Sequence, residues 1–270
     1  MWSFFNDLDE DMSRYQPPLT LTTKILALVA DISEQIGQLS AGDDSRQTPQ
    51  LRRGNRIRTI QASLAIENNT LSVEQVTAVL EGKRVLGLPR EIQEVRNAFA
   101  AYEAMPQWTP SDRADLLKAH ELLMFGLIDD AGRFRHSGVG IYRGEQLIHM
   151  APPASRVAQL IDDLLQWQSV SDWHPLIASC VFHYEFEFIH PFTDGNGRMG
   201  RLWQTLILSQ WRPVLAYLPV EAVIRDQQDA YYAALSAADQ QAEATPFVEF
   251  MLHALSLALA EASDSQGPSS

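Results

Sequence analysis

Apolar residues recur with helical spacing along most of the chain. Between residues 21 and 39, Ile25, Leu28, Ile32 and Ile36 are separated by three or four positions, which places them on one face of an α-helix. Similar patterns predict helices over residues 55–67, 72–80, 89–105, 111–123, 154–170, 175–189, 197–211, 223–239 and 245–261. The sequence therefore predicts an all-α fold, in which Ser111 is a suitable N-cap for the helix over 111–123.

One segment departs from the helical pattern. Residues 138–149 contain Gly138, Gly140 and Gly144 among apolar and β-branched positions. This pattern is typical of a short β-hairpin, which we expect to turn at Arg143 and Gly144. Residues 40–50 carry loop-forming residues, so we expect a connection there.

Length, charge and cysteine content exclude several classes of protein. With 270 residues, 46% of them hydrophobic, the chain is long enough to bury a sizeable core. Its 21 basic and 34 acidic residues give a net charge of −13, which argues against a nucleic-acid partner because such binding depends on neutralising phosphates. No apolar run is long enough to span a membrane. The single cysteine, Cys180, rules out an intramolecular disulfide, and we expect a cytoplasmic protein without a membrane partner.

The segment 190–201 carries the candidate chemistry. It reads His-Pro-Phe-Thr-Asp-Gly-Asn-Gly-Arg-Met-Gly-Arg. Its glycine-rich turn points backbone N–H groups inward and leads into a helix N-terminus, an arrangement that binds anions. Arg198 and Arg201 are three residues apart and share a helix face, so the segment suits a polyphosphate. Asp194 is a suitable ligand for Mg²⁺, and His190 is a suitable general base for a hydroxyl.

The same segment also fits a different motif. Gly195, Gly197 and Gly200 spell the Gly-x-Gly-x-x-Gly of dinucleotide-binding proteins. Residues 182–188 alternate as a strand would, and residues 214–220 could form a second strand. However, residues 182–188 also fit a buried helix, the glycines do not follow directly, and the surrounding chain is helical. A dinucleotide-binding oxidoreductase therefore stays only as an alternative.

Residues 190–201 resemble the Fic family motif, His-Pro-Phe-x-Asp-Gly-Asn-Gly-Arg-x-x-Arg, at every defined position. The resemblance extends over about residues 15–255. Residues 132–135 resemble the Gly-x-x-Arg that precedes the family's flap, and residues 138–149 resemble the flap. Residues 63–68, Ser-Leu-Ala-Ile-Glu-Asn, resemble the family's inhibitory motif Ser/Thr-x-x-x-Glu-Gly/Asn.

The resemblance implies a Fic-type helical bundle with a β-hairpin flap beside the active-site loop. It divides the chain into an N-terminal helical region over 1–110 that carries the inhibitory motif, a catalytic core over 111–258, and a disordered tail over 259–270. The activity implied is AMPylation, in which ATP donates AMP to a Ser, Thr or Tyr hydroxyl of a target protein or of the enzyme itself. ATP, an unidentified target protein and a second copy of the chain are the partners expected.

The resemblance also implies roles for individual residues. His190 is the base that deprotonates the hydroxyl, and Asp194 holds Mg²⁺. The residues implied to bind ATP are Gly195, Asn196, Gly197, Arg198, Met199, Gly200, Arg201 and Tyr232. Within this set Arg198 assists the leaving pyrophosphate, Arg201 holds the γ-phosphate, and Tyr232 falls near the adenine pocket together with Asp239. The flap residues implied to align the target peptide as an added strand are Ile141, Leu147 and Ile148.

The inhibitory motif predicts an intramolecular brake. Ser63 and Glu67 are four residues apart on one helix face, and we expect Glu67 to pair bidentately with Arg201. This pairing removes the partner of the γ-phosphate and predicts low basal activity. In relatives that run the reaction in reverse, the glutamate positions a water that removes AMP. A de-AMPylase and an ATP-binding regulatory module therefore remain as alternatives.

Overall fold

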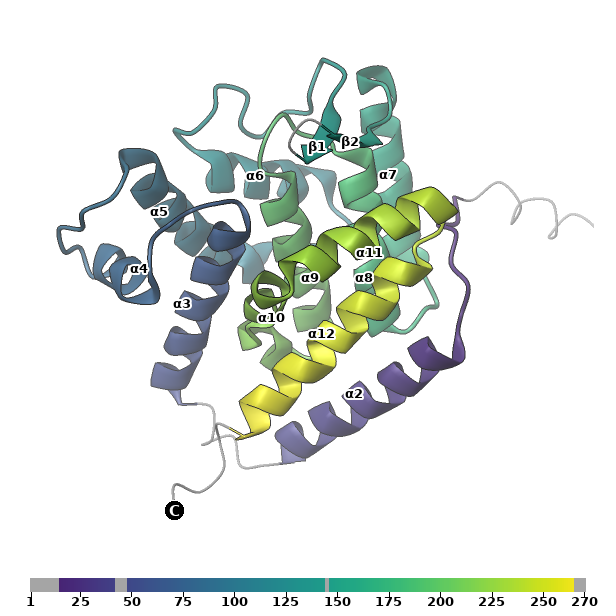
Figure 1. Cartoon of the computed structure of the whole chain (residues 1–270), viewed down its shortest axis with the longest axis horizontal. Coiled ribbons are helices and arrows are strands. Elements are labelled where there is room, and N and C mark those ends of the chain that lie inside the picture. Colours follow the sequence, from purple (N-terminus) through teal and green to yellow (C-terminus); the bar gives the residue numbers. More distant parts are fainter. Residues whose placement is uncertain (1–14, 42–47, 144–145, 265–270) are drawn as a thin grey trace, which may run out of the picture.

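The computed structural model describes residues 15–41, 48–143 and 146–264. The fold is almost wholly helical (Figure 1), which confirms the predicted class. Two consecutive helices, α8 (Pro175–Ile189) and α9 (Asn196–Trp211), occupy the middle of the bundle. The segment 190–195 joins them, so the candidate motif lies at one end of the central helix pair.

The remaining elements surround this pair. The N-terminal helices are α2 (Thr23–Ala41), α3 (Pro49–Ile66), α4 (Val73–Leu80) and α5 (Pro89–Ala104), and a 3-10 turn (Met105–Gln107) follows α5. The middle of the chain forms α6 (Arg113–Met124), the strands β1 (Gly140–Arg143) and β2 (Gln146–Met150), and α7 (Ala154–Val170). After α9 come a second 3-10 turn (Pro213–Tyr217), α10 (Val220–Asp226), α11 (Gln228–Gln241) and α12 (Thr245–Asp264).

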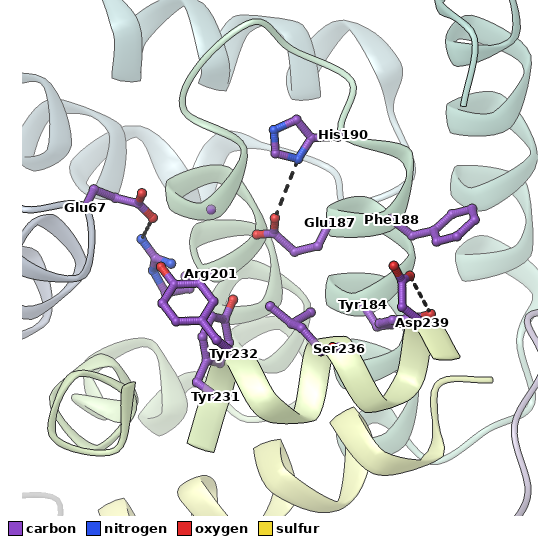
Figure 2. Close-up of a pocket in the computed structure, with 12 residues that line it drawn as sticks. Glu67, Tyr184, Glu187, Phe188, His190, Arg201, Tyr231, Tyr232, Ser236 and Asp239 are labelled. Carbon is purple, nitrogen blue, oxygen red and sulfur yellow. Dashed lines mark hydrogen bonds and ion pairs between the residues drawn. The ribbon is translucent and has the colours of Figure 1, made fainter. Parts of the chain in front are cut away.

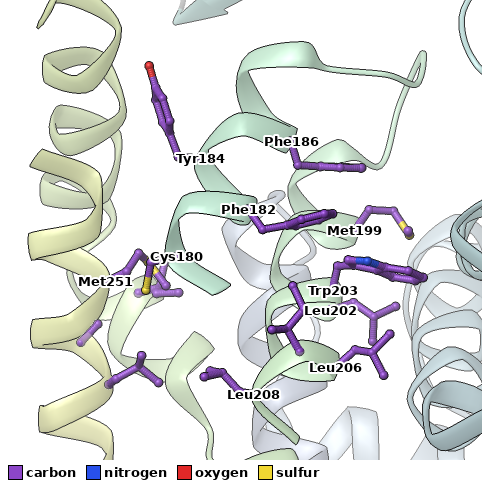
Figure 3. Close-up of a cluster of buried hydrophobic side chains, with 14 of the residues drawn as sticks. Cys180, Phe182, Tyr184, Phe186, Met199, Leu202, Trp203, Leu206, Leu208 and Met251 are labelled. Carbon is purple, nitrogen blue, oxygen red and sulfur yellow. The ribbon is translucent and has the colours of Figure 1, made fainter. Parts of the chain in front are cut away.

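The α8–α9 pair carries several of the largest side chains of the core. Almost every residue of α8 is buried, which explains why its apolar residues cover the whole helix rather than one stripe. Phe182 and Phe186 of α8 lie against Met199 and Trp203 of α9 (Figure 3). The indole of Trp203 stacks on Trp108 with ring centroids 6.2 Å apart, and its Nε1 donates a hydrogen bond of 2.9 Å to the carbonyl of Pro110.

Helices α2 and α12 pack side by side although they are far apart in sequence (Figure 1). The amide of Ala244 donates to the carbonyl of Pro18 at 2.8 Å, and the amide of Thr20 donates to Oγ1 of Thr245 at 2.9 Å. These bonds fix the segment before α2 to the start of α12. No helix among the described residues is long and apolar enough to cross a membrane.

Most of the predicted helices are confirmed, and α7 and α8 have the predicted bounds. The predicted start of the second helix at residue 55 is wrong, because Thr48 caps α3 through a bond from the amide of Leu51 and Pro49 occupies the first turn. The predicted cap of α6 is also wrong. Asp112, rather than Ser111, accepts bonds from the amides of Ala114 and Asp115.

Three further expectations change near the C-terminus. The helix predicted over 223–239 is two helices, because the backbone leaves the helical region at Gln227 (φ −115°, ψ 33°). The alternative strand over 214–220 is instead a 3-10 turn and the start of α10. The expected start of the tail at residue 259 is wrong, since α12 continues to Asp264 and Leu259 is fully buried, and residues 265–270 lie outside the described part of the chain.

The predicted hairpin is confirmed as an antiparallel pair of strands. Gly140 pairs with Met150 and Arg143 with Gln146, with an irregularity between Ile141 and Tyr142. The two residues of the turn, and the side chains of Ile141, Leu147 and Ile148, lie outside the described residues. The backbone of the flap is therefore in place beside the motif loop, and the roles of those three side chains stay a prediction.

Trp203 offers a direct test of the central core. We expect Trp203→Ala to lower the free energy of unfolding by about 3–5 kcal/mol, because it leaves a large cavity and an unsatisfied carbonyl. Urea denaturation measures the change. Trp211→Ala is the matched control, since this residue of the same helix is only half-buried and should cost less. Equal losses in the two variants would contradict the central role of Trp203.

Candidate active site

The motif loop begins with a left-handed turn. His190 caps α8 with φ +48°, a conformation that is unfavourable for residues other than glycine. Buried Arg135 holds the turn, because its Nε donates to the carbonyl of His190 at 2.7 Å and its guanidinium also reaches the carbonyl of Ile189 at 3.2 Å. Without Arg135 these carbonyls at the C-terminus of α8 would lack a partner, and a cation is favourable at this end of a helix.

Arg135 also joins the flap to this loop. Its remaining N–H groups donate to the carbonyls of Ser137 and Pro152, at 2.8 and 2.6 Å. These two residues lie on either side of the hairpin. Arg135 is the last residue of the segment 132–135 that resembles the family's Gly-x-x-Arg, and in the structure it positions the hairpin relative to the motif loop.

His120 is a second support that sequence reasoning missed. The amide of Gly132 donates to its Nδ1 at 2.9 Å, so Nε2 carries the proton and donates to the carbonyl of Asp194 at 3.0 Å. The ring stacks on Phe192, with centroids 3.6 Å apart. Burial lowers the pKa of His120 to about 4, which keeps the ring neutral. Its only sequence signal is its place on the apolar face of α6.

Several motif residues shape the loop from within. The buried side chain of Asn196 accepts a bond from the amide of Phe192 and donates one to its carbonyl, both at 2.9 Å. Gly195 has φ +83°, and a Cβ there would lie 2.6 Å from Sδ of Met124. The side chain of Met199 is fully buried in the core (Figure 3). These side chains therefore fix the loop's shape, and only backbone groups of this stretch are left to face a ligand.

Gly200 faces α8 rather than open space. A Cβ at this position would lie 2.7 Å from Cδ2 of His183 and 3.0 Å from Oε1 of Glu187. The absence of a side chain therefore lets α9 approach α8 closely, next to two buried titratable groups.

Asp194 and Arg198 lie in a charged cluster with α5. Arg198 pairs with Asp194 at 3.2 Å and with Glu94 at 3.5 Å. Arg90 pairs with Asp194 at 3.0 Å and with Glu94 at 3.4 Å. Arg198 is nearly buried, with 5% of its side chain exposed, whereas 42% of Asp194 is exposed. Two arginines and two carboxylates thus alternate at the front of the motif loop.

Arg201 is a buried residue of α9, and residues at the end of α3 bind its guanidinium. Its Nε donates to Oγ of Ser63 at 3.1 Å, and one terminal nitrogen donates to the carbonyl of Ser63 at 3.0 Å and to Oε1 of Glu67 at 2.8 Å. The predicted pairing with Glu67 is confirmed, but its bidentate geometry is wrong because Ser63 takes the other donor directions. Burial acts to lower the pKa of Arg201, but Glu67, Tyr231 and Glu187 together raise it by more, so the group stays charged.

Glu67 also lies over the N-terminus of α9. It follows the last residue of α3 as the C-cap, and a Cβ on Gly197 would lie 2.4 Å from its Oε1. Its carboxylate therefore lies next to the first turn of α9, the end of the helix that attracts anions.

A cavity of about 740 Å³, partly open to solvent, connects these groups. Figure 2 shows it between α8, α9 and α11, with Glu67 at one end. The residues that line it are Glu67, Tyr184, Glu187, Phe188, His190, Gly197, Arg201, Tyr231, Tyr232, Leu235, Ser236 and Asp239.

The cavity brings together some predicted residues and leaves others out. His190, Gly197, Arg201, Tyr232 and Glu67 all line it, although they come from four different helices or helix ends. The predicted residues that do not line it are Ser63, Asp194, Gly195, Asn196, Arg198, Met199 and Gly200. Sequence reasoning missed Glu187 and the apolar wall formed by Tyr184, Phe188 and Leu235, because only the tertiary structure brings α8 and α11 to the same cavity.

Asp194 is the carboxylate that the sequence predicts as a metal ligand. The described residues contain no group of three or more His, Cys, Asp or Glu side chains placed to hold an ion. Asp194 is partly exposed and lies at the motif loop. Mg²⁺ often uses one or two carboxylates together with substrate phosphates, so Asp194 fits an ion that arrives with a nucleotide.

The neutral state of His120 predicts a pH-dependent stability. An unfolded histidine titrates near about 6.5, whereas burial lowers the pKa of His120 to about 4. Between these values the unfolded chain binds more protons, so this group's contribution is present above about pH 6.5 and is lost as the pH falls to about 4. We expect His120→Gln to reduce the fall in unfolding free energy over this range, by up to about 3 kcal/mol. Urea denaturation at several pH values measures it.

Glu185 has the opposite effect on the pH dependence of the unfolding free energy. Burial raises its pKa to about 7, so its contribution is present below its unfolded pKa and is lost as the pH rises towards about 7. The test is therefore the difference between parent and variant rather than either profile alone. The same pH dependence in both would show that His120 titrates normally in the folded chain.

The sequence is similar to proteins of one known family. The sequence profile of the Fic/DOC family matches residues 110–208. Protein adenylyltransferase fic-1 of Caenorhabditis elegans is 30% identical over 242 residues, which are 84% of this chain and 44% of that protein. Protein adenylyltransferase Fic of Drosophila melanogaster is 29% identical over 204 residues, or 71% and 39% of the two chains. The chain thus spans less than half the length of these curated relatives.

Solved structures agree with the fold. A Fic-1 fragment from Caenorhabditis elegans has a TM-score of 0.70 at 24% identity over 92% of this chain and 73% of that one, which supports the fold alone. The crystal structure of a Fic family protein from Desulfovibrio desulfuricans G20 is 66% identical, covers 95% of this chain and 79% of that chain, and has a TM-score of 0.91. Together with the profile match over the motif, this likeness shows that the chain belongs to the Fic/DOC family.

Proposed function

We propose that this protein is an autoinhibited protein adenylyltransferase, which moves AMP from ATP to a hydroxyl of a target protein or of itself. The observation that carries the proposal is the convergence of His190, Arg201 and the N-terminus of α9 on one cavity, with Glu67 bound where a phosphate would lie. The curated relatives carry the name protein adenylyltransferase, which supports the same reaction.

Each chemical requirement of AMP transfer has a candidate group. The attacking hydroxyl must lose a proton, and His190 lines the cavity with 17% of its side chain exposed. The phosphates need positive groups aimed at developing charge, which the backbone at Gly197 and the guanidinium of Arg201 supply. Arg198 borders the same turn and would assist the leaving pyrophosphate. The apolar wall near Tyr232 would receive the adenine ring.

Asp194 would hold Mg²⁺ together with the ATP phosphates. Such an ion, when bound, neutralises phosphate charge during transfer. To hold the metal, Asp194 would have to give up its ion pairs with Arg90 and Arg198. Because Asp194 is at the loop's exposed side, this exchange leaves the buried supports of the loop in place.

Glu67 acts as the brake by substituting for a phosphate. It neutralises Arg201 through the 2.8 Å ion pair and covers the helix N-terminus at Gly197. An incoming γ-phosphate must displace this carboxylate, or the triphosphate must bend away from Arg201. Either result misaligns the α-phosphorus, and misplacement of reacting atoms by small distances lowers the rate strongly.

Removing the brake gives the first test. We expect Glu67→Gly to increase transfer of label from α-³²P-ATP to protein by roughly 10- to 100-fold, the value of a charged hydrogen bond of about 1.5–3 kcal/mol. Purified protein is incubated with Mg²⁺ and labelled ATP, with and without cell lysate, and is resolved on a gel. The double variant Glu67→Gly, His190→Ala should lose the label.

Glu81→Gly is the matched control. Glu81 is the C-cap of α4 and pairs with Lys83 at 2.7 Å, on the surface, so the same substitution there should leave the signal unchanged. Equal labelling in Glu67→Gly and the parent would contradict the brake. Absence of label in every variant, with no ATP binding by calorimetry, would contradict the proposed function.

AMP removal is the second candidate activity. Glu67 lines the cavity and 37% of its side chain is exposed, so its carboxylate can bind both Arg201 and a water. Protein labelled by the Glu67→Gly variant provides the substrate. Release of labelled AMP on adding the parent protein, and not on adding Glu67→Gly, would assign the hydrolytic role to Glu67.

A further inference from the structure

A buried carboxylate lies beside His190 and has no part in the function proposed so far. Glu187 is on α8, three residues before His190, with 10% of its side chain exposed, and its Oε2 lies 4.0 Å from Nδ1 of His190 (Figure 2). We propose that Glu187 is the positioning residue of the base: it orients the His190 ring through Nδ1 and stabilises the imidazolium formed during transfer. This inference rests on the proposed role of His190.

The reaction explains why the base needs a carboxylate. A substrate hydroxyl gives its proton to Nε2 of His190 as its oxygen bonds to the α-phosphorus, and the bond to the bridging oxygen breaks so that pyrophosphate leaves with the electron pair. His190 becomes a cation at this moment, in a cavity that also contains the Arg201 guanidinium. A fixed negative charge beside Nδ1 offsets that repulsion and favours the ring orientation in which Nε2 faces the substrate.

Glu187 meets the requirement of being ionised at neutral pH. Burial acts to raise the pKa of its carboxyl, but neighbouring His183, with the charges of His190 and Arg201, lowers it by more. The titratable groups that face Glu187 are His183 and His190 on its own helix, Arg201 on α9, and Tyr231 and Tyr232 on α11. Glu67 is opposite, on the far side of Arg201.

The carboxylate also lies next to an ordered polar cluster. Its Oε1 lies 3.7 Å from Nε2 of His183, which is 3.3 Å from the hydroxyl of Tyr231. Nδ1 of His183 is fixed by Oε1 of Gln204 at 2.7 Å. A Cβ on Gly200 would lie 3.0 Å from Oε1 of Glu187, so this glycine of the motif makes room for the carboxylate. The 4.0 Å to His190 can shorten on substrate binding, as catalytic contacts often do.

A different role for Glu187 would be electrostatic support of Arg201. The two roles predict different kinetics. Loss of support for Arg201 weakens ATP binding and raises KM, whereas loss of support for His190 lowers kcat and changes its pH dependence. The kinetic comparison below therefore separates them.

The kinetic test introduces Glu187→Gln into the Glu67→Gly background. We expect kcat for AMP transfer to fall at least about tenfold, with KM for ATP within about twofold. The acidic limb of the kcat–pH profile should move about one pH unit lower, because an opposite charge at this distance shifts a pKa by about 1–3 units. Glu185→Gln is the matched control, since Glu185 is a buried carboxylate of the same helix that binds Tyr15, and it should leave the limb in place.

A second readout does not depend on activity. The ring of His190 is titrated by NMR without nucleotide in the otherwise unchanged protein and in Glu187→Gln, with its signals assigned by comparison with His190→Ala. We expect the midpoint to fall by about one pH unit in the variant. If Glu187→Gln unfolds, Glu187→Asp keeps the charge but withdraws it, and should give a smaller shift in the same direction.

The outcomes separate the inference from the proposed function. An unchanged His190 midpoint in the folded variant overturns the inference, even if AMP transfer is confirmed. A raised KM with an unshifted pH limb also overturns it and assigns Glu187 to Arg201. A shifted midpoint in a protein that transfers no AMP supports the Glu187–His190 coupling and rejects the proposed function instead.

Discussion

The guanidinium of Arg201 imposes the strongest constraint on this structure. It is buried beneath the central helix pair with 1% of its side chain exposed, and a buried charge is costly unless it is paired and hydrogen-bonded. Ser63 and Glu67 supply these partners from the end of α3. The N-terminal helices are thereby joined electrostatically to the motif helix. A nucleotide phosphate is the other group that could satisfy the same charge, so stability and activity compete for one side chain.

The motif loop is held from behind so that its front can face a ligand. Arg135 binds the carbonyls at the end of α8, His120 binds the carbonyl of Asp194, and Asn196 binds both backbone groups of Phe192. All three supports are buried. These supports bind backbone groups of the loop. The groups that line the cavity, which are His190, the backbone at Gly197 and Arg201, are therefore not needed to hold the loop in shape.

The charged residues of the site are arranged on two sides of this loop. Asp194 and Arg198 face α5, where Arg90 and Glu94 pair with them. Arg201 and Glu187 face α11 and the cavity. The loop's left-handed residues at His190 and Gly195 produce this separation, since they turn the chain sharply at both of its ends.

The sequence alone determined what depends on neighbouring residues. The helices over 154–170 and 175–189 follow from local periodicity, and the hairpin follows from its glycines. The chemistry of residues 190–201 is readable because its turn, helix start and two arginines are contiguous. Tertiary structure decided what depends on distant contacts. Sequence placed Glu67 against Arg201 only through the family resemblance, and it gave the wrong geometry because the competing bonds of Ser63 appear only after packing. His120 reaches Asp194 across 74 residues, and Tyr232 enters the cavity because α11 folds back over α8. Glu187 is only three residues from His190, but its burial and the left-handed turn at His190 appear only in the folded chain. Tertiary structure therefore decided its environment, since charge acts through space rather than along the chain.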